Sequence, residues 1–528
     1  MIKTEDKTVE YWQNQCEEKD KLCDEKDKII EALKQQILLM QHRQFGRKSE
    51  RHEIDGQLFL FNEAEELANP DIPEPGIESI TYDRKKRKGK REEDLSGLPV
   101  EQIVYELPEE EQKCPECGEK LHVIGREVRR EVKIIPAQFE VIEHIQLVYS
   151  CRPCEKNNEH VPVIKAPIPA PVIKNSIASP SAVAHVMTQK FVNAMPLYRQ
   201  EKDFFRNGFV LSRQTMANWM IKCADDWLLP LYEKLRKLLL KREIAHADET
   251  TMQVLKEPGK APETKSYMWM YRTCGDTSKH IVIFEYQPDR NYYRPKDFLK
   301  GFSGFLHTDG YAAYHGLPEN IIVVGCWAHC RRYWDNALKV VEKDKKKESN
   351  AYIGLAYCQR LFMLERQFEG LTPEERKEQR LKYSLPIAEA FYKWVKRIEA
   401  VPSLPLGKAI TYTLSQWPYL KNVFLDGRLE LSNNRAENSI RPITLGRKNW
   451  LFACTVKGAK SSAVIYSIIQ TAIDNDLNPF SYLKYLFEQL PNSNEPIESF
   501  LPWNDNVLEI CQMPTNWKGK DNAKKDKH

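Results

Sequence analysis

Three acidic residues have the type and the surroundings needed for metal-assisted phosphoryl transfer. Asp248 lies in IAHADETT, Asp309 in FLHTDGYAAY and Glu437 in LSNNRAENSIRP. The two aspartates end short apolar runs typical of strands, and the glutamate follows a predicted helix start. Three such carboxylates can hold two divalent ions about 3.5–4 Å apart, which stabilise the attacking and leaving oxygens of an in-line displacement. Mg²⁺, or Mn²⁺ in its place, suits carboxylate ligands, so the pattern predicts a polynucleotidyl transferase.

Each of these acidic residues also has a purely structural interpretation. Most of the 75 acidic residues must lie on the solvated surface; Asp309 fits a plain turn, and Glu437 fits the first turn of a helix. Glu249 is a rival ligand, but strand alternation points it away from Asp248. Arg441, four residues after Glu437 on the same helical face, is a candidate phosphate contact. The order strand, strand, helix favours the catalytic interpretation.

The segment 241–337 alternates strand and helix signals and predicts the first part of a catalytic core. Five apolar runs predict strands, one helical stretch (293–300) lies between the third and fourth, and another begins at about Cys330. This is the order of the ribonuclease-H-like fold, in which a carboxylate on the first strand lies beside one ending the fourth. The predicted strands are IAHADETTMQVL, SYMWMYRTCG, KHIVIFEYQ, FSGFLHTDG and ENIIVVGCWAH.

An all-helical insertion is predicted over 338–430, with either a substrate-gripping or a scaffolding role. A capping-box pattern at Thr372 and Glu375 marks one of its helix starts.

The core resumes over 431–491, where a helix is expected to start at 433–437. The segment 446–452 predicts a basic, aromatic turn, and 461–473 predicts an amphipathic helix. Basic side chains here are candidate DNA contacts: Arg435, Arg447 and Lys448.

The cluster CWAHCRR at 326–332 combines metal-ligand and basic residue types. Its cysteines and histidine are spaced too tightly for a usual zinc knuckle. We therefore expect Cys326 in the core, and His329, Arg331 and Arg332 facing DNA or the active site.

Two CxxC pairs predict a zinc-binding domain over 100–166. The pairs are separated by 33 residues, of which 129–150 alternate polar and apolar like a β-hairpin, and this would bring four thiolates together around one structural Zn²⁺. The alternative is chance pairs of buried cysteines. The predicted ligands are Cys114, Cys117, Cys151 and Cys154.

Residues 167–240 predict a helical, helix-turn-helix-like region. Asn207-Gly208 marks a break between two helices, and Ser212 is a plausible N-cap for the second. That helix carries Arg213, Gln214 and Asn218, side chains that can read base edges in the major groove. The alternative is an ordinary helical hairpin.

The N-terminal residues 1–45 carry a heptad pattern, with lysines in the middle of the seam. This favours an oligomerising coiled coil, at least a dimer, over a solvated single helix. The linker 46–99 is predicted disordered; it contains Arg47 and Lys48 in a basic turn, and a basic run at 84–91 that is either solvated or a DNA contact. A polar, disordered tail is expected over 492–528.

The composition restricts the class of protein. A chain of 528 residues exceeds one core, so several domains are expected. It lacks the long apolar run of a membrane span and the pattern of a signal peptide, so a soluble cytoplasmic protein is expected. The net charge of +4 decides nothing about partners, and thirteen cysteines with only two tight pairs fit a reducing compartment.

The motifs resemble, in order and over nearly the whole length, those of the large transposase of the IS66 family of bacterial insertion sequences. The matching motifs are FGRKSE, CPECG, ADET, TDGY, CWAH, NNRAENSIRP and GRKNWLF. The resemblance implies a multidomain α+β DDE transposase with the triad Asp248, Asp309 and Glu437. It also implies a nucleoid-associated bacterial protein and two accessory proteins from the same element. Cys330 and Cys454 depart from the expected Ala and Gly.

The expected function is therefore DNA transposition. The chain would bind double-stranded DNA at the ends of its element, cut a strand and join it to target DNA. Two alternatives remain open: a DNA-binding regulator or domesticated transposase without catalytic activity, and a ribonuclease-H-like nuclease that does not join strands.

Overall fold

The computed structural model describes residues 139–150, 163–275 and 279–513, together with seven helical positions between Lys19 and Ile37. The chain divides into two units, 1–48 with 142–512, and 49–141 with 513–528. Several predictions lie outside the described residues: the disordered linker, most of the coiled coil, and the site residues Arg47, Lys48, Cys114, Cys117, Cys151 and Cys154.

The described N-terminal positions include three apolar residues of the predicted heptad seam. Ile30, Leu33 and Ile37 are helical, and their side chains are about half exposed in the single chain. Apolar seam residues of this kind are covered when a second helix pairs with them. Coiled-coil formation stays a prediction.

A short antiparallel hairpin and a run of helices precede the main sheet. The hairpin pairs β1 (Val148–Ser150) with β2 (Val163–Lys165). The predicted break is present. The helix before it ends with Asn207 as its C-cap, and Gly208 adopts φ +84°. The predicted cap is also present, since Ser212 Oγ accepts a hydrogen bond from the backbone N–H of Thr215 at 3.1 Å. The helices are α5 (Pro180–Phe191), α6 (Leu197–Arg206), α7 (Arg213–Cys223) and α8 (Leu229–Leu239), with a π-helical turn η2 (Ala224–Leu228) between the last two.

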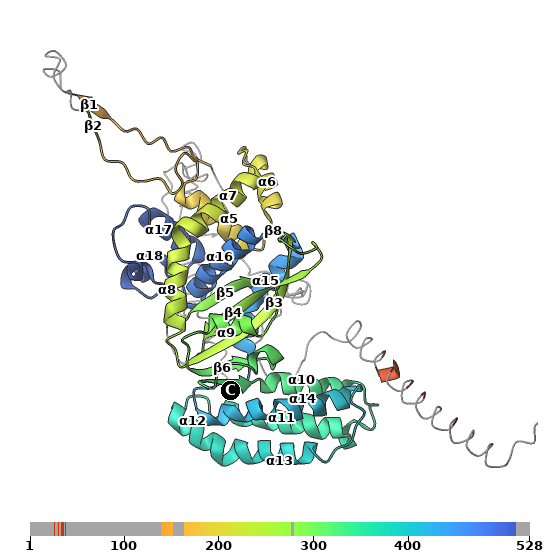
Figure 1. Ribbon diagram of the computed structural model, residues 1–528. Helices are drawn as coiled ribbons and strands as arrows, with labels where there is room; N and C mark the ends of the chain where they lie inside the picture. The colour runs from red at the N-terminus through yellow and green to blue at the C-terminus, as the bar shows by residue number, and fades with distance from the viewer. Residues whose placement is uncertain are drawn as a thin grey trace, which may run out of the picture. The chain divides into compact units, whose positions relative to one another are not determined.

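The five predicted strands form one sheet in the order β5-β4-β3-β6-β7 (Figure 1). β3 is antiparallel to β4 and parallel to β6, and a short strand β8 pairs with its far end. The strands are β3 (Ile244–Lys256), β4 (Lys265–Thr273), β5 (Val282–Gln287), β6 (Gly304–Thr308), β7 (Ile321–Gly325) and β8 (Ala453–Thr455). The helix α9 (Tyr293–Phe298) and the turn η3 (Ala312–Tyr314) flank β6. Helix α10 begins at Trp327, three residues earlier than expected.

The strand register decides which side chains share a face of the sheet. His246 on β3 lies opposite Arg272 on β4 and His307 on β6. Since side chains alternate along a strand, Asp248 and Asp309 follow His246 and His307 on this same face. Helix α15 (Asn434–Trp450) packs against β3 and β4. The sheet thus brings two of the predicted carboxylates to the helix that carries the third.

The segment after α10 (Trp327–Lys339) is a helical bundle with its own apolar core (Figure 1). Trp334, Phe391 and Trp394 lie at its centre. The predicted capping box at Thr372 and Glu375 is present. The bundle contains η4 (Lys346–Glu348), α11 (Asn350–Gln367), α12 (Pro373–Gln379), η5 (Arg380–Ser384), α13 (Leu385–Val395), α14 (Pro405–Leu420) and η6 (Lys421–Leu425).

Helix α16 (Val456–Asp474) protects the outer edge of the sheet. The hydroxyls of Ser467 and Thr471 accept hydrogen bonds from the backbone N–H groups of Phe284 and Val282 on β5. Edge strands with unpaired backbone groups invite aggregation, and these contacts satisfy them. The amphipathic prediction for 461–473 is wrong, because most of this helix is buried all round between β5 and other helices.

Two further expectations for the C-terminal part are wrong. The segment 446–452 is not a turn, because α15 continues to Trp450 and only the segment's last two residues, Leu451 (φ +62°) and Phe452, lie beyond the helix. The expected tail is ordered up to 513: α17 (Pro479–Gln489) is followed by η7 (Ile497–Phe500) and α18 (Asp505–Cys511), and Phe500, Leu501, Val507 and Cys511 are buried in the core. That core also takes in residues of α5–α8 and the sheet.

No helix in the described part of the chain is long and apolar enough to cross a membrane.

Candidate active site

Asp248 lies in the middle of β3, half-buried, with other carboxylates as its neighbours. Its Oδ1 accepts a hydrogen bond from the backbone N–H of Glu249 at 2.8 Å. Burial, followed by the negative charges of Glu249, Asp309 and Glu437, raises the pKa of Asp248 well above the usual range. The charges of both other predicted carboxylates thus act on Asp248. Such a site favours a bound proton or a metal ion.

Asp309 follows the end of β6 on a turn that the helical bundle holds in place. Its Oδ1 accepts a hydrogen bond from the backbone N–H of Tyr311 at 2.9 Å. Tyr412 Oη and Gln416 Nε2, both on α14, donate to the backbone carbonyls of Asp309 and Gly310 at 3.1 and 3.3 Å. The bundle therefore holds the turn that carries Asp309.

Glu437 lies in the first turn of α15, facing the start of α10. Its Oε1 lies 3.6 Å from His329 Nδ1, and its Oε2 lies 3.4 Å from Arg332 Nη2. Burial lowers the pKa of His329, so this imidazole is neutral at pH 7 despite the nearby carboxylate. His329 and Arg332 thus face Glu437. Arg331 does not: its guanidinium lies over the ring of Phe362 on α11.

The unused oxygens of these carboxylates fit a site for cations. Asp248 and Asp309 each use Oδ1 for a backbone hydrogen bond, and no described residue donates to either Oδ2. Glu437 Oε1 is buried without a hydrogen bond in the described structure. Carboxylate oxygens with free lone pairs and like-charged neighbours are the donors that Mg²⁺ and Mn²⁺ prefer. The residues present therefore fit divalent ions.

Glu249, the rival ligand, is engaged elsewhere. Its carboxylate forms an ion pair with Arg290 and accepts a hydrogen bond from Tyr314 Oη at 2.6 Å. Arg290 also stacks on Tyr311, whose hydroxyl donates to the Arg290 carbonyl at 2.8 Å. Sequence patterns did not identify Arg290, Tyr311 or Tyr314 as supports of the site. The tyrosines that follow the TDG motif at 308–310 were the one feature of the sequence that could have indicated these supporting residues.

Comparison with known families shows which family the chain belongs to. The family described as "Transposase IS66 family" matches residues 175–461, more than half of the chain. The chain belongs to the IS66 transposase family. The resemblance drawn from the motifs is confirmed, and further matches cover the flanks of this IS66 protein. They are "Transposase C of IS166 homeodomain" over 32–103, "zinc-finger binding domain of transposase IS66" over 111–155 and "IS66 C-terminal element" over 467–503.

Relatives of this IS66 protein occur in Sinorhizobium fredii (strain NBRC 101917 / NGR234). It is 28% identical to "Uncharacterized protein y4jD" over 464 residues, 84% of this chain and 88% of the relative. It is 29% identical to "Uncharacterized protein y4qI" over 490 residues, 88% of this chain and 87% of the relative. The IS66 protein is thus a multidomain α+β chain with an N-terminal helical region, a zinc-finger domain and a DDE transposase domain.

The predicted base-reading residues of the IS66 chain lie on one exposed helix face. Arg213, Gln214 and Asn218 on α7 are exposed, while Met216 and Trp219 pack into the core. The guanidinium of Arg213 lies 5.7 Å from the ring of Tyr198 on α6. This face is available for a groove of DNA, and DNA contact stays a prediction.

The basic residues of α15 differ in what their side chains contact. Arg435 points away from the carboxylates and pairs with Glu430 at 2.9 Å. Arg447 binds Thr251 on β3, which fixes it in the fold. Arg441 is half-buried, and the described residues give its side chain no hydrogen bond or ion pair. Lys448 is exposed at the end of the helix. Of these four, Arg441 and Lys448 best fit a DNA contact.

Proposed function

We propose that this IS66-family protein is an active DDE transposase that cuts DNA at the ends of its element and joins the freed strand to target DNA. The observation that carries the proposal is the triad itself. Asp248 lies on β3 and Asp309 directly follows β6, the parallel neighbour of β3. The charge of Glu437 reaches Asp248 from α15. The strand order, three antiparallel strands followed by two parallel ones, supports a ribonuclease-H-like core.

The carboxylates have separate roles in the proposed reaction. Asp248 would bridge two Mg²⁺ or Mn²⁺ ions, with Asp309 and Glu437 each holding one. Bound there, the ions would lower the pKa of the attacking hydroxyl and stabilise the charge on the leaving oxygen. The oxygen of a water first attacks the phosphodiester at the element end, and the P–O3′ bond breaks to free a 3′ hydroxyl. That hydroxyl then attacks a target phosphodiester, and the target's own 3′ oxygen leaves.

Other side chains would position the DNA. Arg441 lies one helical turn after Glu437 without a partner in the described structure, so it can hold a phosphate beside the carboxylates. Neutral His329 and the exposed Arg332 flank Glu437 from α10. These groups supply hydrogen-bond donors where the scissile strand must lie.

The remaining domains would select the substrate. One Zn²⁺ on Cys114, Cys117, Cys151 and Cys154 would fold the zinc-finger domain, whose family match spans all four cysteines. Exposed Arg213, Gln214 and Asn218 on α7 would read the element ends. The N-terminal heptads would join at least two copies, so that both ends are held together, and accessory proteins of the element would assist.

A strand-transfer assay tests the proposal. Labelled duplexes carrying the DNA ends that flank the gene are incubated with target DNA and Mg²⁺ or Mn²⁺. We expect metal-dependent joined product from wild type and from the control Glu389→Ala, whose side chain is exposed on α13. Glu437→Ala should bind the ends but neither cut nor join them. Joined product from Glu437→Ala would refute the triad, and cleavage without joining by wild type would favour the nuclease alternative.

A further inference from the structure

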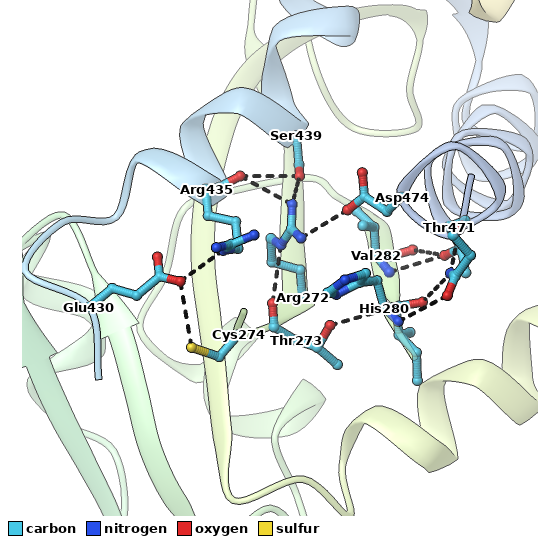
Figure 2. A network of polar contacts seen from close by, with 12 residues as sticks. Arg272, Thr273, Cys274, His280, Val282, Glu430, Arg435, Ser439, Thr471 and Asp474 are labelled. Carbon is cyan, nitrogen blue, oxygen red and sulfur yellow. Dashed lines mark hydrogen bonds and ion pairs between the residues drawn. The ribbon is translucent and has the colours of Figure 1, made fainter. Parts of the chain in front are cut away.

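A second cluster of metal-binding side chains lies on the same sheet face, one row before the carboxylates. His246 precedes Asp248 by two residues on β3, Cys274 directly follows β4, and Glu430 lies in the segment that leads into α15. One donor atom from each lies within 4.8 Å of the others. In the described parts of the chain no other three His, Cys, Asp or Glu residues come this close together. Figure 2 shows Cys274 and Glu430 approaching each other from separate segments.

Asn433 fixes the tautomer of the His246 ring. The Asn433 amide donates from Nδ2 to the carbonyl of Ala247 at 2.9 Å, so its Oδ1 faces His246 Nδ1, also at 2.9 Å. An amide oxygen only accepts, so Nδ1 must carry the ring proton, and Nε2 keeps a lone pair. The His246 side chain is fully buried, and Nε2 has no hydrogen-bond partner in the described structure. An orphaned buried acceptor of this kind needs a ligand, and metal-bound histidines use this second-shell arrangement.

The distance between the other two donors suits a tetrahedral ion. Cys274 Sγ lies 3.8 Å from Glu430 Oε1, and the cysteine is almost fully buried. In a tetrahedral zinc site with Zn–S about 2.3 Å and Zn–O about 2.1 Å, a sulfur and an oxygen ligand lie about 3.6 Å apart. Arg435 contacts the same carboxylate at 2.9 Å. Its guanidinium would then hydrogen-bond a metal ligand from outside the coordination sphere.

We propose that His246, Cys274 and Glu430 bind one Zn²⁺ ion, separate from both the carboxylate site and the zinc finger. A thiolate and an imidazole select zinc over Mg²⁺, and two anionic ligands neutralise the ion in its buried position. The ion would tie the first part of β3 to the end of β4 and to the segment before α15. These elements carry Asp248 and Glu437, so the ion would fix the spacing of two catalytic carboxylates. The proposal does not depend on strand-transfer activity.

Metal counting in the full-length protein tests the proposal. Protein purified without chelators is analysed by inductively coupled plasma and native mass spectrometry. Wild type should hold two zinc equivalents, one in the zinc finger and one here. Cys274→Ser should lose one equivalent. The matched control Cys223→Ser, which changes a cysteine equally buried in α7, should keep both. Equal zinc content in wild type and Cys274→Ser would overturn the proposal.

A second variant separates loss of metal from loss of folding. Glu430→Gln keeps the side chain's shape and can still accept a hydrogen bond from Arg435, but it removes an anionic ligand. Removing even an outer-shell partner typically costs 10–100-fold in affinity, so we expect this zinc to be bound more than about 100-fold more weakly while circular dichroism stays unchanged. With Co²⁺ in place of zinc, wild type should show an additional thiolate charge-transfer band that Cys274→Ser lacks. A folded Glu430→Gln protein with unchanged zinc affinity would also overturn the proposal.

Discussion

Two groups of charged side chains lie on the face of the sheet covered by α15, and they differ in how their charges are balanced. Around Arg272, the buried guanidinium pairs with Asp474 at 2.8 Å and donates to Ser439 Oγ and to the carbonyls of Thr273 and Arg435 (Figure 2). Around Asp248, by contrast, the nearest charges are other carboxylates.

The difference separates structural charges from functional ones. A buried ion that is paired and fully hydrogen-bonded keeps the fold together, and removing one partner is costly. A group of carboxylates that repel one another destabilises the fold until a cation binds. Electrostatic strain of this kind is typical of a catalytic centre.

Replacing Asp248 should have the largest effect. Asp248→Asn removes the carboxylate that would bridge both ions, and we expect strand transfer to fall by roughly 10³-fold or more, equivalent to about 4 kcal/mol of transition-state stabilisation. The single-turnover rate of joining measures it. Binding to element ends should stay within about twofold of wild type, and a variant that still joins at the wild-type rate would rule out a metal-bridging role.

The same substitution should stabilise the metal-free protein. Folding raises the pKa of Asp248 above its usual 3.8, so the native state holds the proton more tightly than the unfolded state. The stability of wild type must therefore fall as pH rises from about 4 through the raised pKa. Asp248→Asn should lack this fall and show a higher Tm at pH 7 without Mg²⁺. Added Mg²⁺ should reduce the difference in Tm between the two proteins, because it stabilises wild type alone.

Replacing the cation of the balanced group around Arg272 should lower the stability of the protein, whereas Asp248→Asn should raise it. Arg272→Ala leaves Asp474 without its partner, and we expect a loss of roughly 3 kcal/mol in the free energy of unfolding. This is the low end for a buried pair, because the Asp474 side chain is 24% exposed. The control is Arg428→Ala, whose guanidinium is 31% exposed and pairs with the exposed Glu243 and the half-buried Asp426. Because Arg428 itself stays in contact with solvent, this loss should be smaller, about 1 kcal/mol. Urea unfolding of both variants measures the two losses of unfolding free energy. Equal losses would contradict the view that the Arg272 pair is the more important one for stability.

The turn at Asp309 tests whether the helical bundle supports the catalytic centre. Gly310 adopts φ +94°, and a Cβ there would lie 2.8 Å from Gln416 Oε1 and 3.2 Å from Tyr412 Oη. Gly310→Ala should cost about 1–2 kcal/mol from the backbone alone and lower strand transfer about 10–100-fold by displacing Asp309. Gly208→Ala is the control for stability, since its φ is similar, at +84°, but no atom lies within 4 Å. If both variants lost the same stability, contact with α14 would not restrain the turn.

The local parts of this picture were predictable from sequence, and the long-range parts were not. Asp248, Asp309 and Glu437 each stand at the end of an apolar run or inside a helix start, so short windows reveal them. The pair Arg272 and Asp474 depends on how α16 docks on the sheet. The segment 446–452 looked like a turn because of its glycine and basic residues. Tertiary packing overrides that pattern, since Gly446 lies close against Trp450 and Tyr466 within a continuous helix.

The smallest expected effect concerns Arg332, a cation that reaches the carboxylate group. Its guanidinium lies 3.4 Å from Glu437 Oε2 and is about half exposed, so it competes weakly with a metal ion for that carboxylate. Arg332→Gln should lower the Mg²⁺ concentration for half-maximal joining about two- to threefold, equivalent to a surface ion pair of about 0.5 kcal/mol.

A separate measurement shows whether Arg332 contacts a DNA phosphate. If it does, the slope of log binding constant against log salt concentration should become about one unit shallower in Arg332→Gln. Lys339→Gln is the matched control, because Lys339 lies on the same helix but pairs with Asp335. A rise in the Mg²⁺ requirement of Arg332→Gln would mean that this arginine helps to organise the carboxylates and does not compete for them.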